Sequence, residues 1–166
     1  MTRRQWLGLL SSLGFGATAV RTADAAPALK GAPNAIEPLV LSDAVWRQRL
    51  TPAQYNVLRE EGTERAGTSP LNAEKRKGVF QCAGCDLPLF ASTTKYESGT
   101  GWPSFYDTLP GAVQTKRDFH LVLPRTEYHC ARCGGHQGHV FSDGPKPTGL
   151  RYCNNGVALK FIAEAA

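Results

Sequence analysis

Five cysteines are the most reactive side chains of this chain, and their spacing divides them into two groups. Four form two Cys-x-x-Cys pairs, Cys82 with Cys85 and Cys130 with Cys133, and the fifth is Cys153. Four thiolates complete a tetrahedral zinc shell and leave no open position for catalysis. The pattern therefore predicts one structural zinc ion on the paired cysteines and one thiol free for chemistry.

Cys-x-x-Cys pairs also serve functions other than zinc binding. A c-type haem site needs histidine after the second cysteine, where Asp86 and Gly134 stand instead. A thioredoxin-like redox pair belongs at a strand-to-helix junction in a βαβ context, which the flanking sequence lacks. Structural disulfides stay open as an alternative in an exported protein. Two matching pairs with 44 residues between them favour zinc.

Cys153 lies in the segment Arg151-Tyr152-Cys153-Asn154-Asn155. A lone cysteine on a strand is often a small buried hydrophobe, and that alternative stays open. In an extended segment, however, Arg151 and Asn155 project to the same face as Cys153. We expect the arginine charge to lower the pKa of the thiol, which favours a nucleophilic cysteine.

Two further segments can build a pocket around such a thiol. Residues 99–105 form a glycine-hinged loop that displays Trp102, and residues 136–145 contain His136 and His139. Taken singly, Trp102 could be a core residue and His139 a structural histidine. Together they offer an apolar platform and proton donors, which a cysteine nucleophile needs.

The remaining sequence predicts a mainly β domain with small N-terminal helices. Thr51, Pro52 and Gln54 form a helix start with a capping box, and this helix should run to about Glu61 and stop at Gly62. A shorter helix is expected after Ser42 and Asp43. Short apolar runs separated by turn residues indicate antiparallel strands at 78–81, 112–116, 119–123, 126–130, 138–141 and 157–162.

The N-terminus has the features of an export signal. Thr2-Arg3-Arg4-Gln5-Trp6-Leu7 is a twin-arginine pattern, an apolar stretch reaches Val20, and Ala23-Asp24-Ala25 supplies a cleavage site. We therefore expect a signal peptide at residues 1–25, an extended arm at 26–41 and a periplasmic protein, with an uncleaved anchor as the alternative. Folded export suits thiols that are already bound to zinc.

The net charge gives little support for a polyanionic partner. The chain carries +5, and removal of residues 1–25 leaves 16 basic and 13 acidic residues, a net charge of +3. We therefore expect no nucleic-acid partner.

The order of the motifs resembles the peptide methionine-(R)-S-oxide reductases. These motifs are Cys-x-x-Cys, Gly-Trp-Pro-Ser-Phe, a second Cys-x-x-Cys, Gly-His-Val-Phe-x-Asp-Gly-Pro and Arg-Tyr-Cys-x-Asn, and the match covers about residues 40–161. The resemblance implies a β-tent of two antiparallel sheets in a single domain at residues 42–164. It also implies structural zinc on the four paired cysteines and Cys153 as the nucleophile.

The implied reaction is the reduction of methionine (R)-sulfoxide, mainly in peptides or proteins, through a sulfenic acid on Cys153. By similarity, His139 and His136 hold or protonate the sulfoxide oxygen. Supporting residues are Asp143, Arg151 and Asn155, and substrate contacts are Trp102, Phe105 and Phe141.

One position departs from the common family pattern. Many members carry a recycling cysteine two positions before the tryptophan, where this chain has Thr100. We therefore expect an external, thioredoxin-like thiol to reduce the Cys153 sulfenic acid. Two other classes stay open: a zinc-ribbon binding module, which would not need Cys153, and a disulfide oxidoreductase acting through a Cys-x-x-Cys pair.

Overall fold

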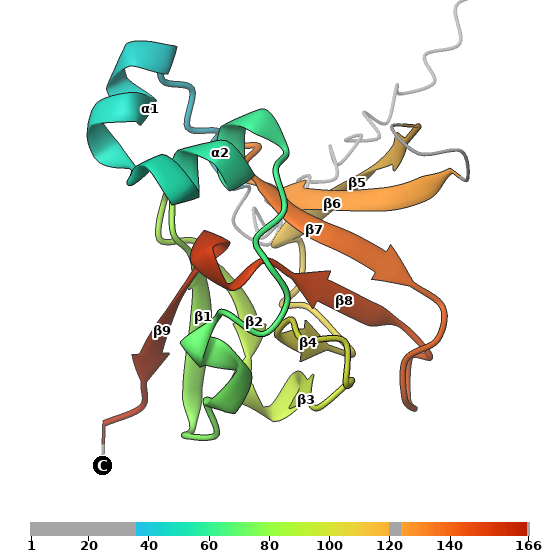
Figure 1. The fold of residues 1–166 in the computed structure, drawn as a ribbon. Helices are drawn as coiled ribbons and strands as arrows, with labels where there is room; N and C mark the ends of the chain where they lie inside the picture. The colour runs from blue at the N-terminus through green and yellow to red at the C-terminus, as the bar shows by residue number, and fades with distance from the viewer. Residues whose placement is uncertain (1–35, 120–123, 166) are drawn as a thin grey trace, which may run out of the picture. The chain divides into compact units, whose positions relative to one another are not determined.

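The computed structural model describes residues 36–119 and 124–165 (Figure 1). The predicted signal peptide, the arm up to residue 35 and residues 120–123 of one predicted strand lie outside the described residues. The described end of the arm, residues 36–41, is irregular, and the Leu39 N–H donates a hydrogen bond of 2.7 Å to the Arg132 carbonyl. Within the described residues, no helix is both long and apolar enough to cross a membrane.

Two short helices precede the sheets. Helix α1 spans Asp43–Arg49 and helix α2 spans Pro52–Glu60. The predicted capping box is confirmed: the Thr51 side chain accepts from the Gln54 N–H, and the Gln54 side chain accepts from the Thr51 N–H. The helix ends at Glu60 because Glu61 takes a left-handed conformation with φ of 57°, one residue before the expected glycine.

The smaller sheet has the order β2-β1-β9, and both of its strand pairs are antiparallel. Its strands are β1 at Gly78–Cys82, β2 at Pro88–Ala91 and β9 at Leu159–Ala163. The prediction of a strand from residue 157 was wrong at its start, because Gly156–Ala158 form a short 3₁₀ helix, η3. Glu64 accepts the N–H groups of Gly156 and Val157, which removes them from strand pairing.

The larger sheet has the order β3-β4-β8-β7-β6-β5 and is antiparallel throughout. Its strands are β3 at Lys95–Tyr96, β4 at Ser104–Phe105, β5 at Val113–Asp118, β6 at Arg125–Cys130, β7 at His136–Phe141 and β8 at Arg151–Asn154. Two more 3₁₀ helices, η1 at Pro70–Ala73 and η2 at Ser92–Thr94, connect the elements. The predicted class of two antiparallel sheets with short helices is confirmed.

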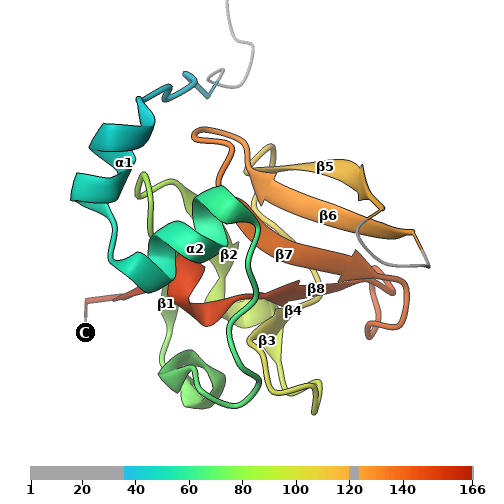
Figure 2. The same cartoon turned by 45° about the horizontal axis from the view of Figure 1, so that its top comes forward.

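Aromatic side chains join the two sheets. Phe90 of the smaller sheet stacks on Phe105 of the larger one, with ring centroids 4.1 Å apart, and Phe80 meets the same ring edge-on at 4.9 Å. Tyr128 and Tyr152 extend this cluster across β6 and β8. The helices lie at one end of the smaller sheet, where the turn after β1 approaches α2 (Figure 2). The core therefore uses one face of the larger sheet and leaves the other face for the site.

Candidate active site and metal centre

Cys153 and His139 occupy directly opposed positions on β8 and β7. The same row continues with Glu127 opposite His139 and Lys116 opposite Glu127. A second row, two residues away on each strand, contains the pairs Asp118 with Arg125 and Phe141 with Arg151. Side chains two residues apart on a strand share a face. Register therefore gathers the thiol, an imidazole, two acids and three basic side chains on the sheet face opposite the aromatic core.

A β-bulge places His136 on this face as well. Tyr128 pairs with Gly138 and His129 pairs with His136, so Gln137 is an extra residue on β7. In a regular strand, residues three apart point to opposite faces. The bulge instead brings the rings of His136 and His139 to a centroid distance of 5.5 Å. The sequence predicted that both histidines contribute to one site, and the bulge brings their side chains to the same face of the sheet.

A pocket of about 120 Å³ opens beside Cys153. Its lining residues come from five separate segments: Thr63, Trp102, Arg125, Gly138, His139, Phe141, Cys153 and Asn155. The structure thus brings Trp102, His139, Phe141 and Asn155 together with the thiol. His136 lies behind His139 and is almost completely buried.

Phe105 is the one predicted substrate contact that the structure does not bring to the pocket. Its side chain is fully buried and stacks on Phe90 in the core. Its cross-strand partner is Tyr152, the neighbour of Cys153, so Phe105 lies on the opposite face of the sheet from the thiol. Alternation along β4 and β8 therefore makes it a packing residue.

The Thr100 hydroxyl lies beside the thiol. Its Oγ1 is 3.9 Å from the Cys153 Sγ and 2.8 Å from the Ser98 Oγ, which is 2.7 Å from the Ser104 Oγ. Burial raises the pKa of the Cys153 thiol above its ordinary value, and the contacts with Thr100 and Arg151 act in the opposite direction. The expected effect of Arg151 is present, but burial outweighs it.

Arg151 is held by two partners on the exposed side of the sheet. Its Nε and Nη2 each donate a hydrogen bond of 2.8 Å to the Asp143 carboxylate, which lowers the pKa of that acid. Its guanidinium also lies 4.3 Å from the centre of the Phe141 ring. The predicted grouping of Asp143 with Arg151 is therefore present as a bidentate pair.

Asn155 and Trp102 are both tied to Glu64, a residue that the sequence did not single out. The Glu64 N–H donates to the Asn155 Oδ1 at 2.9 Å, and the Trp102 indole N–H donates to the Glu64 carbonyl at 3.1 Å. The Asn155 Nδ2 donates to the Gln137 carbonyl at 3.0 Å. Two pocket residues from distant segments thus share one anchor.

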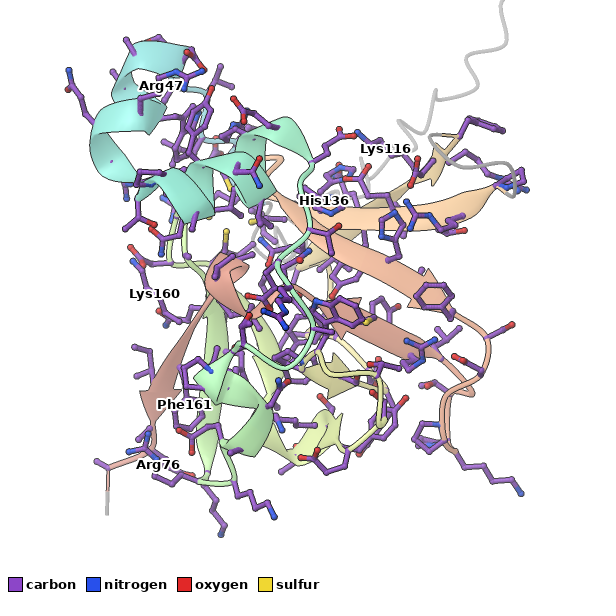
Figure 3. The ribbon with its side chains drawn as sticks, viewed as in Figure 1. Arg47, Arg76, Lys116, His136, Lys160 and Phe161 are labelled. Atoms are coloured by element: carbon purple, nitrogen blue, oxygen red, sulfur yellow. The ribbon has the colours of Figure 1, made fainter. Side chains whose placement is uncertain are left out.

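Two buried acids contact the histidines, and the sequence did not identify either one. Asp118 is hydrogen-bonded to the His139 Nε2 at 2.7 Å, and a Glu127 oxygen lies 2.9 Å from the His136 Nδ1. Burial lowers the pKa of His139, and Asp118 opposes this shift. Burial favours the neutral acid at Glu127, but His136 and Lys116 outweigh it and lower its pKa. Lys116 and His136 are labelled in Figure 3.

The four paired cysteines form a separate cluster. Their Sγ atoms all lie within 4.8 Å of one another, with Cys82 to Cys133 at 3.7 Å and Cys85 to Cys130 at 3.5 Å. A tetrahedral ion with bonds of about 2.3 Å separates its sulfurs by about 3.8 Å. An S–S bond is only about 2.05 Å long, so these sulfurs fit a metal and are not paired as disulfides. All four are buried, as a closed structural site requires.

A family model described as the SelR domain matches residues 50–163, which include both cysteine pairs, the pocket and Cys153. The fold, the four-cysteine cluster and this match together define the class as SelR-domain proteins. The peptide methionine sulfoxide reductase MsrB of Agrobacterium fabrum is 56% identical over 121 residues, which cover 72% of this chain and 90% of the relative.

Two further relatives are also peptide methionine sulfoxide reductases. The peptide methionine sulfoxide reductase MsrB of Leptospira interrogans is 53% identical over 124 residues, covering 74% of this chain and 95% of the relative. The chloroplastic peptide methionine sulfoxide reductase B1 of Arabidopsis thaliana is 52% identical over 124 residues, which cover 74% of this chain and 61% of the relative. The chain belongs to the peptide methionine sulfoxide reductase B family, and it is an oxidoreductase.

Proposed function

We propose that this protein reduces methionine (R)-sulfoxide in peptides and proteins through a sulfenic acid on Cys153. The observation that carries the proposal is the direct pairing of Cys153 with His139 beside a pocket lined by Trp102. A thiol can attack the sulfoxide sulfur there, an imidazole can deliver a proton, and an indole face can receive the methyl group.

The reaction balances with the thiol alone. The Cys153 sulfur gives up its proton and attacks the sulfoxide sulfur, while His139 protonates the sulfoxide oxygen. That oxygen and its proton move to Cys153, which becomes the sulfenic acid, and the substrate leaves as methionine. Two electrons pass from the cysteine sulfur to the substrate sulfur. Arg151, held by Asp143, and Asn155 order the polar side of the pocket.

Preference for one sulfoxide epimer, which the resemblance to the family implies is R, follows from the two unlike sides of the pocket. Trp102 supplies an apolar side, and His139 and Asn155 supply polar groups. A sulfoxide sulfur carries a methyl group, an oxygen and the rest of the side chain. Only one epimer directs the methyl group to the indole and the oxygen to the polar groups while the peptide chain faces solvent.

The experiment that tests this function compares resolved R and S sulfoxide peptides, with dithiothreitol as the reductant. We expect methionine from the R peptide, at least about 100-fold less from the S peptide, and none with Cys153→Ser. A zinc-ribbon binding module would retain its function without Cys153, and a disulfide oxidoreductase would act through the paired cysteines. Equal activity of Cys153→Ser and the unsubstituted protein would contradict the proposal.

The closing step of the cycle requires an external thiol in this proposal. The hydroxyl of Thr100 lies 3.9 Å from the thiol, at the position where many family members carry a recycling cysteine, and the other four cysteines are clustered at a separate site. A thioredoxin-like reductant would therefore attack the sulfenic acid itself. Mass spectrometry after one turnover without reductant should detect a dimedone adduct on Cys153, and an internal disulfide that includes Cys153 would refute this step.

The export signal is the basis for a proposed location. The twin-arginine pattern of residues 2–7 supports delivery to the periplasm, where oxidised envelope proteins would be the substrates. Fractionation of cells that express the chain, and of cells that express Arg3→Lys with Arg4→Lys, tests the route. We expect periplasmic protein only from the cells that express the unsubstituted chain. A rate for free methionine sulfoxide far above the rate for peptides would argue against protein repair.

A further inference from the structure

The structure places a buried carboxylate directly behind the imidazole that faces Cys153. The Asp118 Oδ2 is 2.7 Å from the His139 Nε2, and the Arg125 Nη2 donates to the same oxygen at 2.6 Å. The Asp118 side chain is only 6% exposed. His139 and Arg125 line the pocket, and Asp118 does not. Asp118 therefore reaches the pocket only through other side chains.

The hydrogen bond from Asp118 decides which nitrogen of His139 carries the proton. A carboxylate paired with arginine only accepts hydrogen bonds, so the neutral imidazole is protonated on Nε2 and keeps its lone pair on Nδ1. Burial lowers the pKa of His139, which keeps this neutral form present at neutral pH. Directly opposed residues have Cβ atoms about 5 Å apart. Because Nε2 is bonded to Asp118, Nδ1 is the ring nitrogen left to exchange a proton with the Cys153 thiol.

We propose that Asp118 is a positioning residue that holds His139 in the Nε2–H tautomer, so that Nδ1 takes the proton of Cys153 and passes it to the sulfoxide oxygen. This inference rests on the proposed function. The S–H bond breaks and an Nδ1–H bond forms; the thiolate then attacks the substrate sulfur, and the same proton ends on the sulfenic acid. Asp118 neither gains nor loses a proton. Its negative charge stabilises the imidazolium of His139 while His139 holds the proton of Cys153.

The arrangement is a nucleophile, a base and an orienting acid supplied by three strands of the larger sheet, in which β8 and β7 are neighbours and β6 lies between β7 and β5. Cys153 comes from β8, His139 from β7 and Asp118 from the end of β5. Cys153 and His139 share one cross-strand row, and Asp118 lies in the other row, so the imidazole ring spans the distance between the thiol and the acid. A purely structural acid would also join β5 to β7, and the experiment must separate these two roles.

A double-mutant cycle makes this separation. The rate of methionine formation in a single turnover, with enzyme in excess over the (R)-sulfoxide peptide, is measured for Asp118→Ala in the unsubstituted chain and in His139→Ala. We expect a loss of about 100-fold in the unsubstituted chain, because misplacement of a catalytic group costs this much. In the His139→Ala background the loss should be under about threefold. An equal loss in both backgrounds would overturn the proposal.

A spectroscopic readout is independent of activity and of the proposed function. Two-bond ¹H–¹⁵N correlation spectra should give the Nε2–H pattern for His139 in the resting protein and in Asp118→Asn, which keeps an oxygen acceptor. Asp118→Ala should give a tautomer mixture. The matched control is Glu74→Ala, because Glu74 is a 13%-exposed acid that accepts from the Arg76 Nη2 at 2.6 Å, outside the pocket. Its rate and spectra should not change.

The two proposals fail in different ways. An inactive unsubstituted protein would remove the proposed function, and the spectra would still decide the tautomer. An active protein in which Asp118→Ala keeps the Nε2–H tautomer would overturn the role of Asp118 alone.

Discussion

The indole N–H of Trp102 donates a hydrogen bond of 3.1 Å to the main-chain carbonyl of Glu64. The carboxylate of the same glutamate accepts the N–H groups of Gly156 and Val157, at the start of η3. One residue therefore connects the aromatic side of the pocket to the segment that follows the nucleophile.

Replacement of Glu64 by alanine should weaken both the fold and substrate binding. Hydrogen bonds to a charged group contribute about 1.5–3 kcal/mol, so we expect the free energy of unfolding to fall by about 2 kcal/mol. KM for the sulfoxide peptide should rise several-fold, because the loop that carries the Glu64 carbonyl loses its anchor at η3 and holds Trp102 less firmly. Urea titration and steady-state kinetics measure the two effects. The control is Arg65→Ala, an exposed neighbour on the same loop, which should change neither.

Gly138 should not tolerate alanine. A Cβ at this position would lie 2.0 Å from the Cys153 carbonyl oxygen, and main-chain atoms of two paired strands cannot move apart cheaply. We expect a loss of about 3 kcal/mol in the free energy of unfolding and a displaced nucleophile. At Gly111, with φ of 69°, a Cβ would meet nothing within 4 Å. Gly111→Ala should cost only about 1 kcal/mol, and a similar loss at both sites would show that contact with Cys153 is unimportant.

The resting thiol should be mainly protonated at neutral pH. Burial raises the pKa of Cys153, so the fraction of thiolate at pH 7 is lower than in a free cysteine, and alkylation by iodoacetamide should level off at a higher pH. Thr100→Val removes the hydroxyl that favours the thiolate and should raise this pKa further, whereas Thr100→Ser should not. Mass spectrometry of Cys153 alkylation against pH gives the midpoint directly. A midpoint below that of a free cysteine would contradict this expectation.

The four-cysteine cluster should bind one zinc ion per chain. Zinc would join the turn after β1 to the turn after β6, which come from opposite sheets. Elemental analysis should find one equivalent in the unsubstituted protein and in Cys153→Ser, and none in Cys133→Ser. Loss of the ion should lower stability by at least about 3 kcal/mol, or about 10 °C in the melting temperature. Full stability of Cys133→Ser without metal would show that the cluster needs no ion.

Local sequence was sufficient for features whose partners are close along the chain. The capping box at Thr51 links residues three apart, and it forms as predicted. The Cys-x-x-Cys spacing specifies two tight turns. Because zinc takes four ligands in a structural site, the two cysteine pairs are expected to bind the same ion. Strands β2, β3 and β4 were not predicted, because Pro-Leu-Phe-Ala in β2 does not alternate and the two residues of β3 and of β4 are too few to show alternation.

The sequence by itself determined the division of the cysteines into four and one, the two-sheet class and the residues that carry the family pattern. Only the tertiary structure decided which of these residues meet. Phe105 belongs to a motif of the family, yet its position in strand β4 directs its side chain into the core. Asp118 belongs to no motif, yet it contacts His139, 21 residues away. Side-chain facing depends on strand register and on one bulge, and both are set by packing between distant segments. The single thiol was evident from residue types; the acid behind its histidine required the sheet.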